Sequence, residues 1–157
     1  MKAPSYKTFR PASQRASESL ARNKSTDTKC ERLLRSALWR MGFRFRKNVR
    51  DLPGRPDIVF RGQRIVVFCD GDFWHGRNWI QRRRKLVNGA NSSYWIAKIR
   101  SNIERDKRHD ASLRKLGWTV VRLWEKDILA DVHGAASFVA RKLGGRASQQ
   151  KKNVTLH

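Results

Sequence analysis

Cysteine, acidic side chains and long apolar runs are all scarce in this 157-residue chain. Its two cysteines, Cys30 and Cys69, lie in helix-like and strand-like apolar contexts, which argues against a disulfide framework, and zinc-finger spacing is absent. No run approaches the roughly 18 apolar residues of a membrane span, and the amino end lacks the apolar core of a secretory signal. We therefore expect a cytoplasmic protein with no membrane partner.

The scarcity of acid leaves a large excess of positive charge. The chain has 36 Lys and Arg against 13 Asp and Glu, a formal net charge of +23, which repels itself unless the partner is a polyanion such as nucleic acid. Ribosomal, histone-like and membrane-surface proteins share this composition, so the position of the charge matters more. Residues 77–85 carry five basic groups and no acid, and we expect Arg82, Arg83, Arg84 and Lys85 to hold phosphates.

Length and composition predict one folded domain. Residues 1–25 are rich in Ser, Ala, Lys and Arg and are expected to form a flexible, basic DNA-binding arm. Residues 26–145 are expected to form the catalytic domain, and residues 146–157 a polar tail.

Periodicity predicts an α/β order of elements. Thr28-x-x-Glu31 is a capping box that opens a helix ending near Gly42. Apolar spacing predicts a long or broken helix over 94–116, ended by Gly117, and a closing helix over 132–143. Alternating or continuous apolar runs predict strands over 43–49, 57–60, 64–70 and 118–124, the second and third forming a hairpin across residues 61–63.

Acidic residues gather at one end of this hairpin. Asp57 follows the turn 52–56, while Asp70 and Asp72 end the next strand, so the three carboxylates are expected at one sheet edge. A single aspartate there more often caps or solvates a turn. Mg²⁺, however, prefers oxygen ligands and needs few protein groups. The cluster, with His75 close behind it, favours metal-assisted hydrolysis of a phosphodiester.

Phe73 and Trp74 lie between these carboxylates and the basic run, in a polar loop flanked by Gly71 and Gly76. Aromatic side chains exposed in such a place suit stacking on bases or wedging between base steps. The alternative is a small hydrophobic cluster packed under the loop.

Three motifs in register resemble the signature of the very-short-patch repair (Vsr) endonucleases. They are Leu52-Pro-Gly-Arg-Pro-Asp57, Phe68-x-x-Gly-x-Phe-Trp-His75 and Asn102-Ile-Glu-Arg-Asp106. The resemblance covers about residues 15–130 and implies a restriction-endonuclease-like core, a central mixed β-sheet flanked by helices. It also implies a Mg²⁺-dependent bacterial monomer that nicks one strand of double-stranded DNA at T·G mismatches, with a cytosine-5 methyltransferase as functional companion.

The resemblance also assigns roles to the matching positions. It makes Asp57 the Mg²⁺-binding carboxylate, helped by the backbone carbonyl of Cys69, and His75 a catalytic histidine. Glu31 and Asp106 match supporting acidic positions. The matches to DNA-contacting positions are Phe73 and Trp74, with Leu20 on the arm as a further apolar wedge. Arg55, in the turn before Asp57, is also expected to bind DNA.

Two positions depart from the family pattern. Vsr enzymes commonly hold a structural zinc through Cys and His residues, but Asp72, Arg77 and Lys126 stand at or near those places, so we expect no zinc and a loop held by packing. Asp70 stands where the best-matching members have a histidine, and it could bind metal or act as a base.

Two other readings remain open at this point. One is a restriction-like or nicking endonuclease without mismatch specificity, because fold does not settle substrate. The other is a non-catalytic DNA-binding module in which the acidic cluster only offsets local positive charge.

Overall fold

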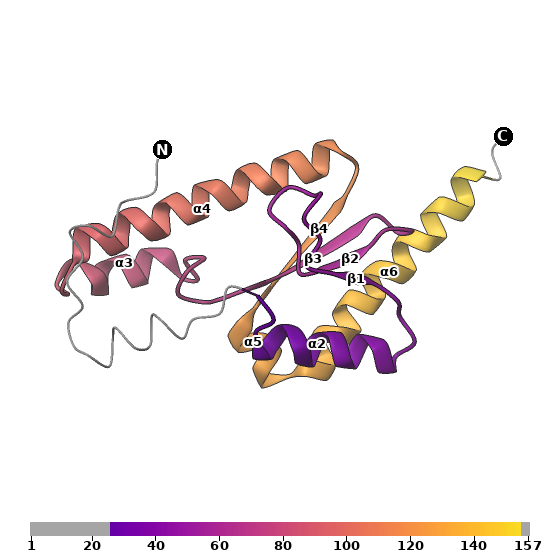
Figure 1. Ribbon diagram of the computed structural model, residues 1–157, viewed down its shortest axis with the longest axis horizontal. Helices are drawn as coiled ribbons and strands as arrows, with labels where there is room; N and C mark the ends of the chain where they lie inside the picture. Colours follow the sequence, from indigo (N-terminus) through magenta and orange to yellow (C-terminus); the bar gives the residue numbers. More distant parts are fainter. Residues whose placement is uncertain (1–25, 155–157) are drawn as a thin grey trace.

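A four-stranded mixed sheet forms the centre of the protein (Figure 1). The computed structural model describes the backbone of residues 26–154 and the side chains of residues 26–145. The strands are β1 (Arg46–Lys47), β2 (Ile58–Phe60), β3 (Ile65–Asp70) and β4 (Thr119–Trp124), in that spatial order. β1, β2 and β3 pair antiparallel, whereas β3 and β4 pair parallel. The predicted α/β, restriction-endonuclease-like architecture is confirmed.

Both faces of the sheet are covered, which explains the continuous apolar sequence of β3. Ile65 and Val67 face α2 (Lys29–Arg40), α5 (Glu125–Ala130) and α6 (Val132–Val154). Val66 and Phe68 face the other way and pack against Leu113 of α4 (Ser92–Lys115) and against Trp118. This two-sided packing fixes β3, whose last residues carry the candidate site.

The first helix, α2, begins at the predicted capping box. The Thr28 side chain accepts a hydrogen bond from the Glu31 backbone N–H, and the backbone N–H of Asp27 donates to Glu31 Oε2 at 2.8 Å. These contacts satisfy donors that a helix start leaves without partners. The Glu31 side chain is buried.

The predicted helix over 94–116 is one unbroken helix, α4, which crosses one face of the sheet and projects beyond it (Figure 1). Its projecting part packs against the shorter α3 (Trp79–Val87). At the other end Gly117 has φ 83° and Trp118 donates its backbone N–H to the carbonyl of Leu113 at 3.0 Å, the left-handed helix ending that glycine permits.

Some element boundaries differ from the sequence prediction. The strand expected over 43–49 is wrong in length, because only Arg46 and Lys47 join the ladder, and Asn48 then adopts a positive φ of 49°. The sequence reading also missed α3 and α5. Where a polar tail was expected after residue 145, the backbone continues as α6 to Val154.

The arm over residues 1–25, with Leu20, lies outside the described residues. Within residues 26–154, no helix combines the length and apolar character needed to cross a membrane.

Candidate active site

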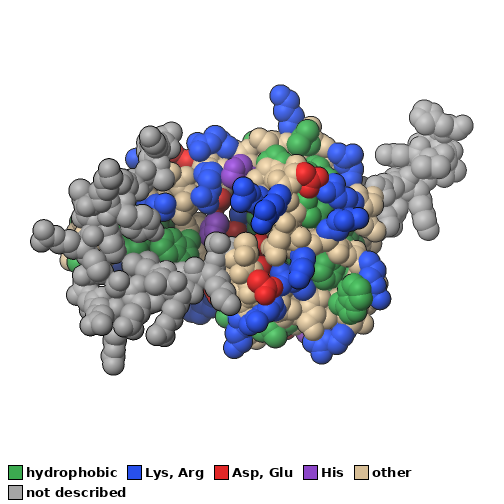
Figure 2. Space-filling view, viewed as in Figure 1, with side chains coloured by type: hydrophobic (Ala, Val, Ile, Leu, Met, Phe, Trp, Pro, Cys, Tyr) green, Lys and Arg blue, Asp and Glu red, His purple; other side chains and the backbone are tan. Residues whose placement is uncertain are grey.

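An open cleft of about 1140 Å³ lies beside the end of β3. Ten of the residues singled out from the sequence line it: Glu31, Arg55, Asp57, Cys69, Asp70, Phe73, Trp74, His75, Arg82 and Asp106. Figure 2 shows histidine and acidic side chains within a hollow that basic side chains surround. The hairpin, the loop that follows it and α4 therefore bring together most of the predicted site.

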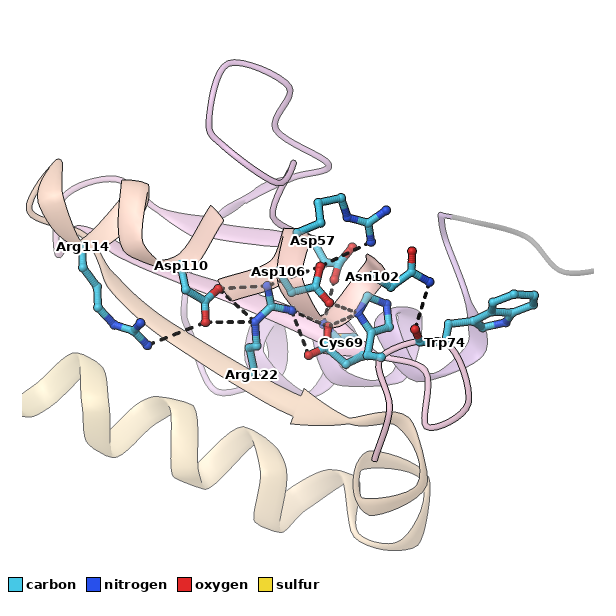
Figure 3. Close-up of polar contacts among 11 residues, drawn as sticks. Asp57, Cys69, Trp74, Asn102, Asp106, Asp110, Arg114 and Arg122 are labelled. Carbon is cyan, nitrogen blue, oxygen red and sulfur yellow. Dashed lines mark hydrogen bonds and ion pairs between the residues drawn. The ribbon is translucent and has the colours of Figure 1, made fainter. Parts of the chain in front are cut away.

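Asp57 enters the cleft from the residue before β2. Its Oδ2 accepts a hydrogen bond of 2.7 Å from the Cys69 backbone N–H, which fixes the carboxylate across the hairpin (Figure 3). Burial raises the pKa of Asp57 to about 7. The negative charges of Glu31 and Asp70 also raise this pKa, whereas the hydrogen bond from the Cys69 N–H lowers it. Among residues 26–145, no Lys, Arg or His forms an ion pair with it.

This electrostatic setting fits a divalent cation at Asp57. A half-buried carboxylate with acidic neighbours gains stability from added positive charge. Mg²⁺ commonly takes one or two carboxylates, with waters completing its shell. Within the part of the chain that is described, no three His, Cys, Asp or Glu side chains converge as a metal-binding group. The residues present therefore suit a site with few protein ligands rather than a closed cage.

His75 and Asp106 form the tightest polar pair in the cleft. Nδ1 of His75 lies 2.6 Å from Asp106 Oδ2, and its distance to Asp70 Oδ1 is 3.6 Å. Burial lowers the pKa of His75, but the Asp106 bond and the charges of Asp70 and Asp106 outweigh it, so the pKa is raised. Burial would raise the pKa of Asp106, yet the His75 bond and nearby cations lower it. The pair is thus an ionised carboxylate that orients an imidazole.

Glu31 reaches the cleft from α2, but its carboxylate already has several partners. Oε1 accepts from the Thr28 hydroxyl at 2.9 Å, and Oε2 accepts from Asp27 N–H and from Arg35 Nη1 at 2.8 and 3.3 Å. Glu31 therefore acts on the cleft through its charge, since it helps raise the pKa of Asp57.

Arg122 is a site residue that the sequence reading missed. From β4 it donates hydrogen bonds to Asp70 and to Asp110, and Asp110 lies one helical turn beyond Asp106 on α4 (Figure 3). The signals in the sequence were an arginine inside an otherwise apolar strand and an aspartate at helical spacing from Asp106. Asp72, expected near Asp57, lines the same cleft, and its carboxylate is paired with Arg77.

The aromatic pair of the loop belongs to a cluster with α4. Trp95 lies 5.3 Å from Phe73 and 5.7 Å from Trp74 between ring centroids, and Tyr94 packs on Trp95. Phe73 and Trp74, expected to be exposed, are partly buried, and both line the cleft. The small-cluster alternative is therefore correct for their packing, while part of each side chain stays accessible.

Three contacts hold the aromatic loop, residues 71–78, in place. Asn102 Nδ2 donates to the Trp74 carbonyl at 3.0 Å. Gly76 has φ 71° and lies so close to Ile103 that an added Cβ would come within 2.4 Å of it, so only glycine fits. Arg77 pairs with Asp72 at 2.9 Å and with Asp127 at 2.8 Å.

The contacts of Asp72 revise the expectation that packing alone holds this loop. Besides the Arg77 ion pair, Asp72 Oδ2 accepts the Lys126 backbone N–H at 3.0 Å. At the three positions where zinc ligands would fall in the family, Asp72 thus contacts both Arg77 and Lys126. An ion pair from Arg77 to Asp127 and a hydrogen bond from the Lys126 backbone N–H to Asp72 connect the loop to α5 in this chain.

The predicted basic contacts divide into two groups. Arg82 lines the cleft and lies over the Phe73 ring at 5.3 Å, whereas Arg83, Arg84 and Lys85 are exposed on α3. Arg55 is exposed at the cleft edge.

Comparison with known proteins identifies the family. Residues 8–81 match the family model described as DNA mismatch endonuclease Vsr. The chain is 38% identical over 129 residues to the Type II nicking enzyme V.NmeDIP of Neisseria meningitidis serogroup C, covering 82% of this chain and 86% of that protein. It is 42% identical to the Type II nicking enzyme V.HpaIIP of Haemophilus parainfluenzae, covering 69% and 76%. It is 39% identical to the DNA mismatch endonuclease Vsr of Escherichia coli (strain K12), covering 63% and 62%. The chain therefore belongs to the Vsr family and is a DNA nicking endonuclease.

Proposed function

We propose that this enzyme nicks one strand of duplex DNA at T·G mismatches by Mg²⁺-dependent hydrolysis. The observation that carries the proposal is that a single cleft brings together the Asp57 carboxylate, the His75–Asp106 pair and the aromatic loop. The chemistry of phosphodiester cleavage and a device for deforming the duplex then act on the same DNA segment.

Asp57 and the Cys69 carbonyl are the proposed metal ligands. Bound there, Mg²⁺ would neutralise charge that grows on the phosphate and make a water more acidic. The Cys69 N–H bond to Asp57 holds this carboxylate in one orientation without an ordering step at the moment of binding.

His75 is the proposed proton-transfer group. Because Asp106 is ionised, it accepts the Nδ1–H of His75, and Nε2 is left with the lone pair that exchanges a proton with the attacking water or the leaving oxygen. Asp106 also stabilises the imidazolium that results. Glu31 supports the site by its negative charge and by capping α2.

Phe73 and Trp74 are the proposed wedge. Unstacking a base step costs a few kcal/mol, and it costs least at a mismatched pair. Rings that are already packed against Trp95 lose little freedom when they insert. Arg55 and the basic residues of α3 (Arg82, Arg83, Arg84 and Lys85) would hold the flanking phosphates, and Leu20 would add a wedge from the arm.

A second candidate is strand nicking without mismatch specificity. It is favoured by the names of the first two relatives, which are Type II nicking enzymes.

Under the mismatch proposal, the T·G pair arises from deaminated 5-methylcytosine, so a cytosine-5 methyltransferase would be the functional companion.

Nicking of a T·G duplex, compared with matched T·A and C·G duplexes in Mg²⁺, tests the proposal. The full-length enzyme is expected to nick only the T·G duplex, and Asp57→Ala to abolish nicking while DNA binding persists. Equal nicking of all three duplexes would support the second candidate. Full activity of Asp57→Ala would overturn the assigned metal ligand.

A further inference from the structure

The Arg122 guanidinium joins both halves of the site. Nη1 donates to both oxygens of Asp70 at 2.8 and 2.9 Å, while Nε and Nη2 donate to Asp110 Oδ1 at 3.0 and 2.9 Å (Figure 3). Nη2 also lies 4.0 Å from Asp106 Oδ1. One side chain of β4 therefore connects the end of β3 with two successive turns of α4.

The position of Arg122 is fixed by the sheet as well as by its charge partners. Arg122 is the register partner of Phe68, and its guanidinium lies 4.2 Å from the centre of the Phe68 ring. Its side chain is 23% exposed, and that of Asp70 is 5% exposed. Hydrogen bonds between planar charged groups in such a protected place are strong and directional.

Asp70 and Asp57 lie at the same edge of the sheet, but their carboxylates have different partners. Asp70 has a dedicated cation on both oxygens, whereas Asp57 accepts the Cys69 backbone N–H. Asp70 is also the more distant of the two aspartates that face His75 Nδ1, at 3.6 Å against 2.6 Å for Asp106.

We propose that Arg122 is a positioning residue: it keeps Asp70 as its counterion and out of the metal's ligand set, and it holds α4 so that Asp106 stays against His75. This inference rests on the proposed metal site at Asp57 but not on mismatch specificity. It removes Asp70 from the candidate metal ligands.

Metal binding by the full-length protein tests the first half. Mn²⁺ titrations by calorimetry would compare Asp57→Asn, Asp70→Asn and Arg122→Gln with the unaltered enzyme. We expect Asp57→Asn to weaken Mn²⁺ binding by about tenfold or more and Asp70→Asn to change it by less than about threefold. Arg122→Gln should tighten it by about threefold or more, because a free carboxylate replaces an ion pair. The double variant Asp70→Asn/Arg122→Gln should return to within about threefold of the starting affinity.

The matched control is Arg114→Gln. Arg114 also pairs with Asp110, at 3.7 Å, but its side chain is 60% exposed and lies farther along α4, so Mn²⁺ affinity should not change. If Asp70→Asn weakens Mn²⁺ binding as strongly as Asp57→Asn, Asp70 is a ligand and the inference is wrong. If neither Asp57→Asn nor Asp70→Asn weakens Mn²⁺ binding, the metal site of the proposed function is refuted instead.

A proton NMR spectrum of the metal-free protein tests the second half. The short His75–Asp106 bond should give a low-field Nδ1–H resonance that Asp106→Asn abolishes and Asp70→Asn retains. Arg122→Gln should broaden or remove it, and Arg122→Lys should restore it only in part, since lysine cannot bridge two carboxylates in a fixed fork. If Arg122→Gln does not fold, Asp110→Asn removes the α4 half of the bridge and should broaden the same resonance. An unaltered resonance in both variants refutes the positioning role.

Discussion

Replacing Asp57 by Asn should make the protein more stable while it abolishes nicking. The substitution removes the charge but keeps an oxygen that can accept the Cys69 N–H. The pKa of Asp57 is raised by burial from 3.8 to about 7, so its ionised form is less favourable in the folded chain than in the unfolded one. At about 1.4 kcal/mol per pH unit this amounts to about 4 kcal/mol, and partial exposure reduces it to about 2–4 kcal/mol.

The pH dependence gives the sign of this effect. The raised pKa does not affect stability while Asp57 is protonated in both the folded and the unfolded chain. The loss of stability begins as the pH rises above about 4 and reaches its full value above about 7. Asp57→Asn should therefore gain about two fifths of the full value at pH 5 and nearly all of it at pH 8. A gain of about 2–4 kcal/mol corresponds to about 4–16 °C in Tm for a chain of this length.

Thermal unfolding at pH 5, 6, 7 and 8 without divalent metal measures the gain. Added Mg²⁺ should raise the Tm of the unaltered enzyme but not that of Asp57→Asn, so the difference in Tm between the two proteins should become smaller. Asp51→Asn is the matched control, because Asp51 is exposed and its pKa is lowered by a hydrogen bond from Arg61, so no gain is expected. A variant less stable than the unaltered enzyme at pH 8, or a gap of equal size at every pH, would refute the reasoning.

Three further outcomes follow from the site. Asp106→Asn should slow single-turnover nicking by about 10²–10⁴-fold with DNA affinity retained; a change below tenfold would remove Asp106 from the mechanism. Replacing Arg83 and Arg84 together by Ala should reduce the slope of log affinity against log salt by up to about 1.8, measured by fluorescence anisotropy, and an unchanged slope would mean that α3 does not touch phosphates. Arg77→Leu should expose residues 71–78 to limited proteolysis and slow nicking, whereas Arg61→Leu, which breaks an exposed pair away from the cleft, should do neither; equal cleavage of both variants would contradict the anchoring role.

The parts of the fold that were predictable are those in which local sequence and packing agree. A few neighbouring residues were enough to predict three features: the capping box of Thr28 and Glu31, the buried strand β3 and the helix end at Gly117. The segment 43–49 misled because Phe43 and Phe45 alternate with polar residues and pack on the core without pairing in a ladder. Hydrogen bonding depends on a partner strand, and side-chain alternation does not reveal where that partner ends.

The candidate site was predictable in composition but not in pairing. Local motifs were enough to name Asp57, His75 and Asp106, and the fold brings all three to one cleft. The partner of Asp70 was out of reach, because Arg122 lies 52 positions away and reaches it only through the parallel pairing of β3 with β4. Its sequence neighbours gave no sign of which carboxylate would be neutralised.

Asp57 and Asp70 show why that pairing matters for function. They face the cleft from adjacent strands, they are the same residue type, and burial raises the pKa of each. Arg122 donates hydrogen bonds directly to Asp70. Asp57 instead accepts one backbone N–H, has two acidic neighbours, and is affected by the positive charge of Arg35 without forming an ion pair with it. A divalent cation gains most where negative charge is left without compensation. If Asp57 holds the metal as proposed, Arg122 favours it over Asp70 by forming an ion pair with Asp70.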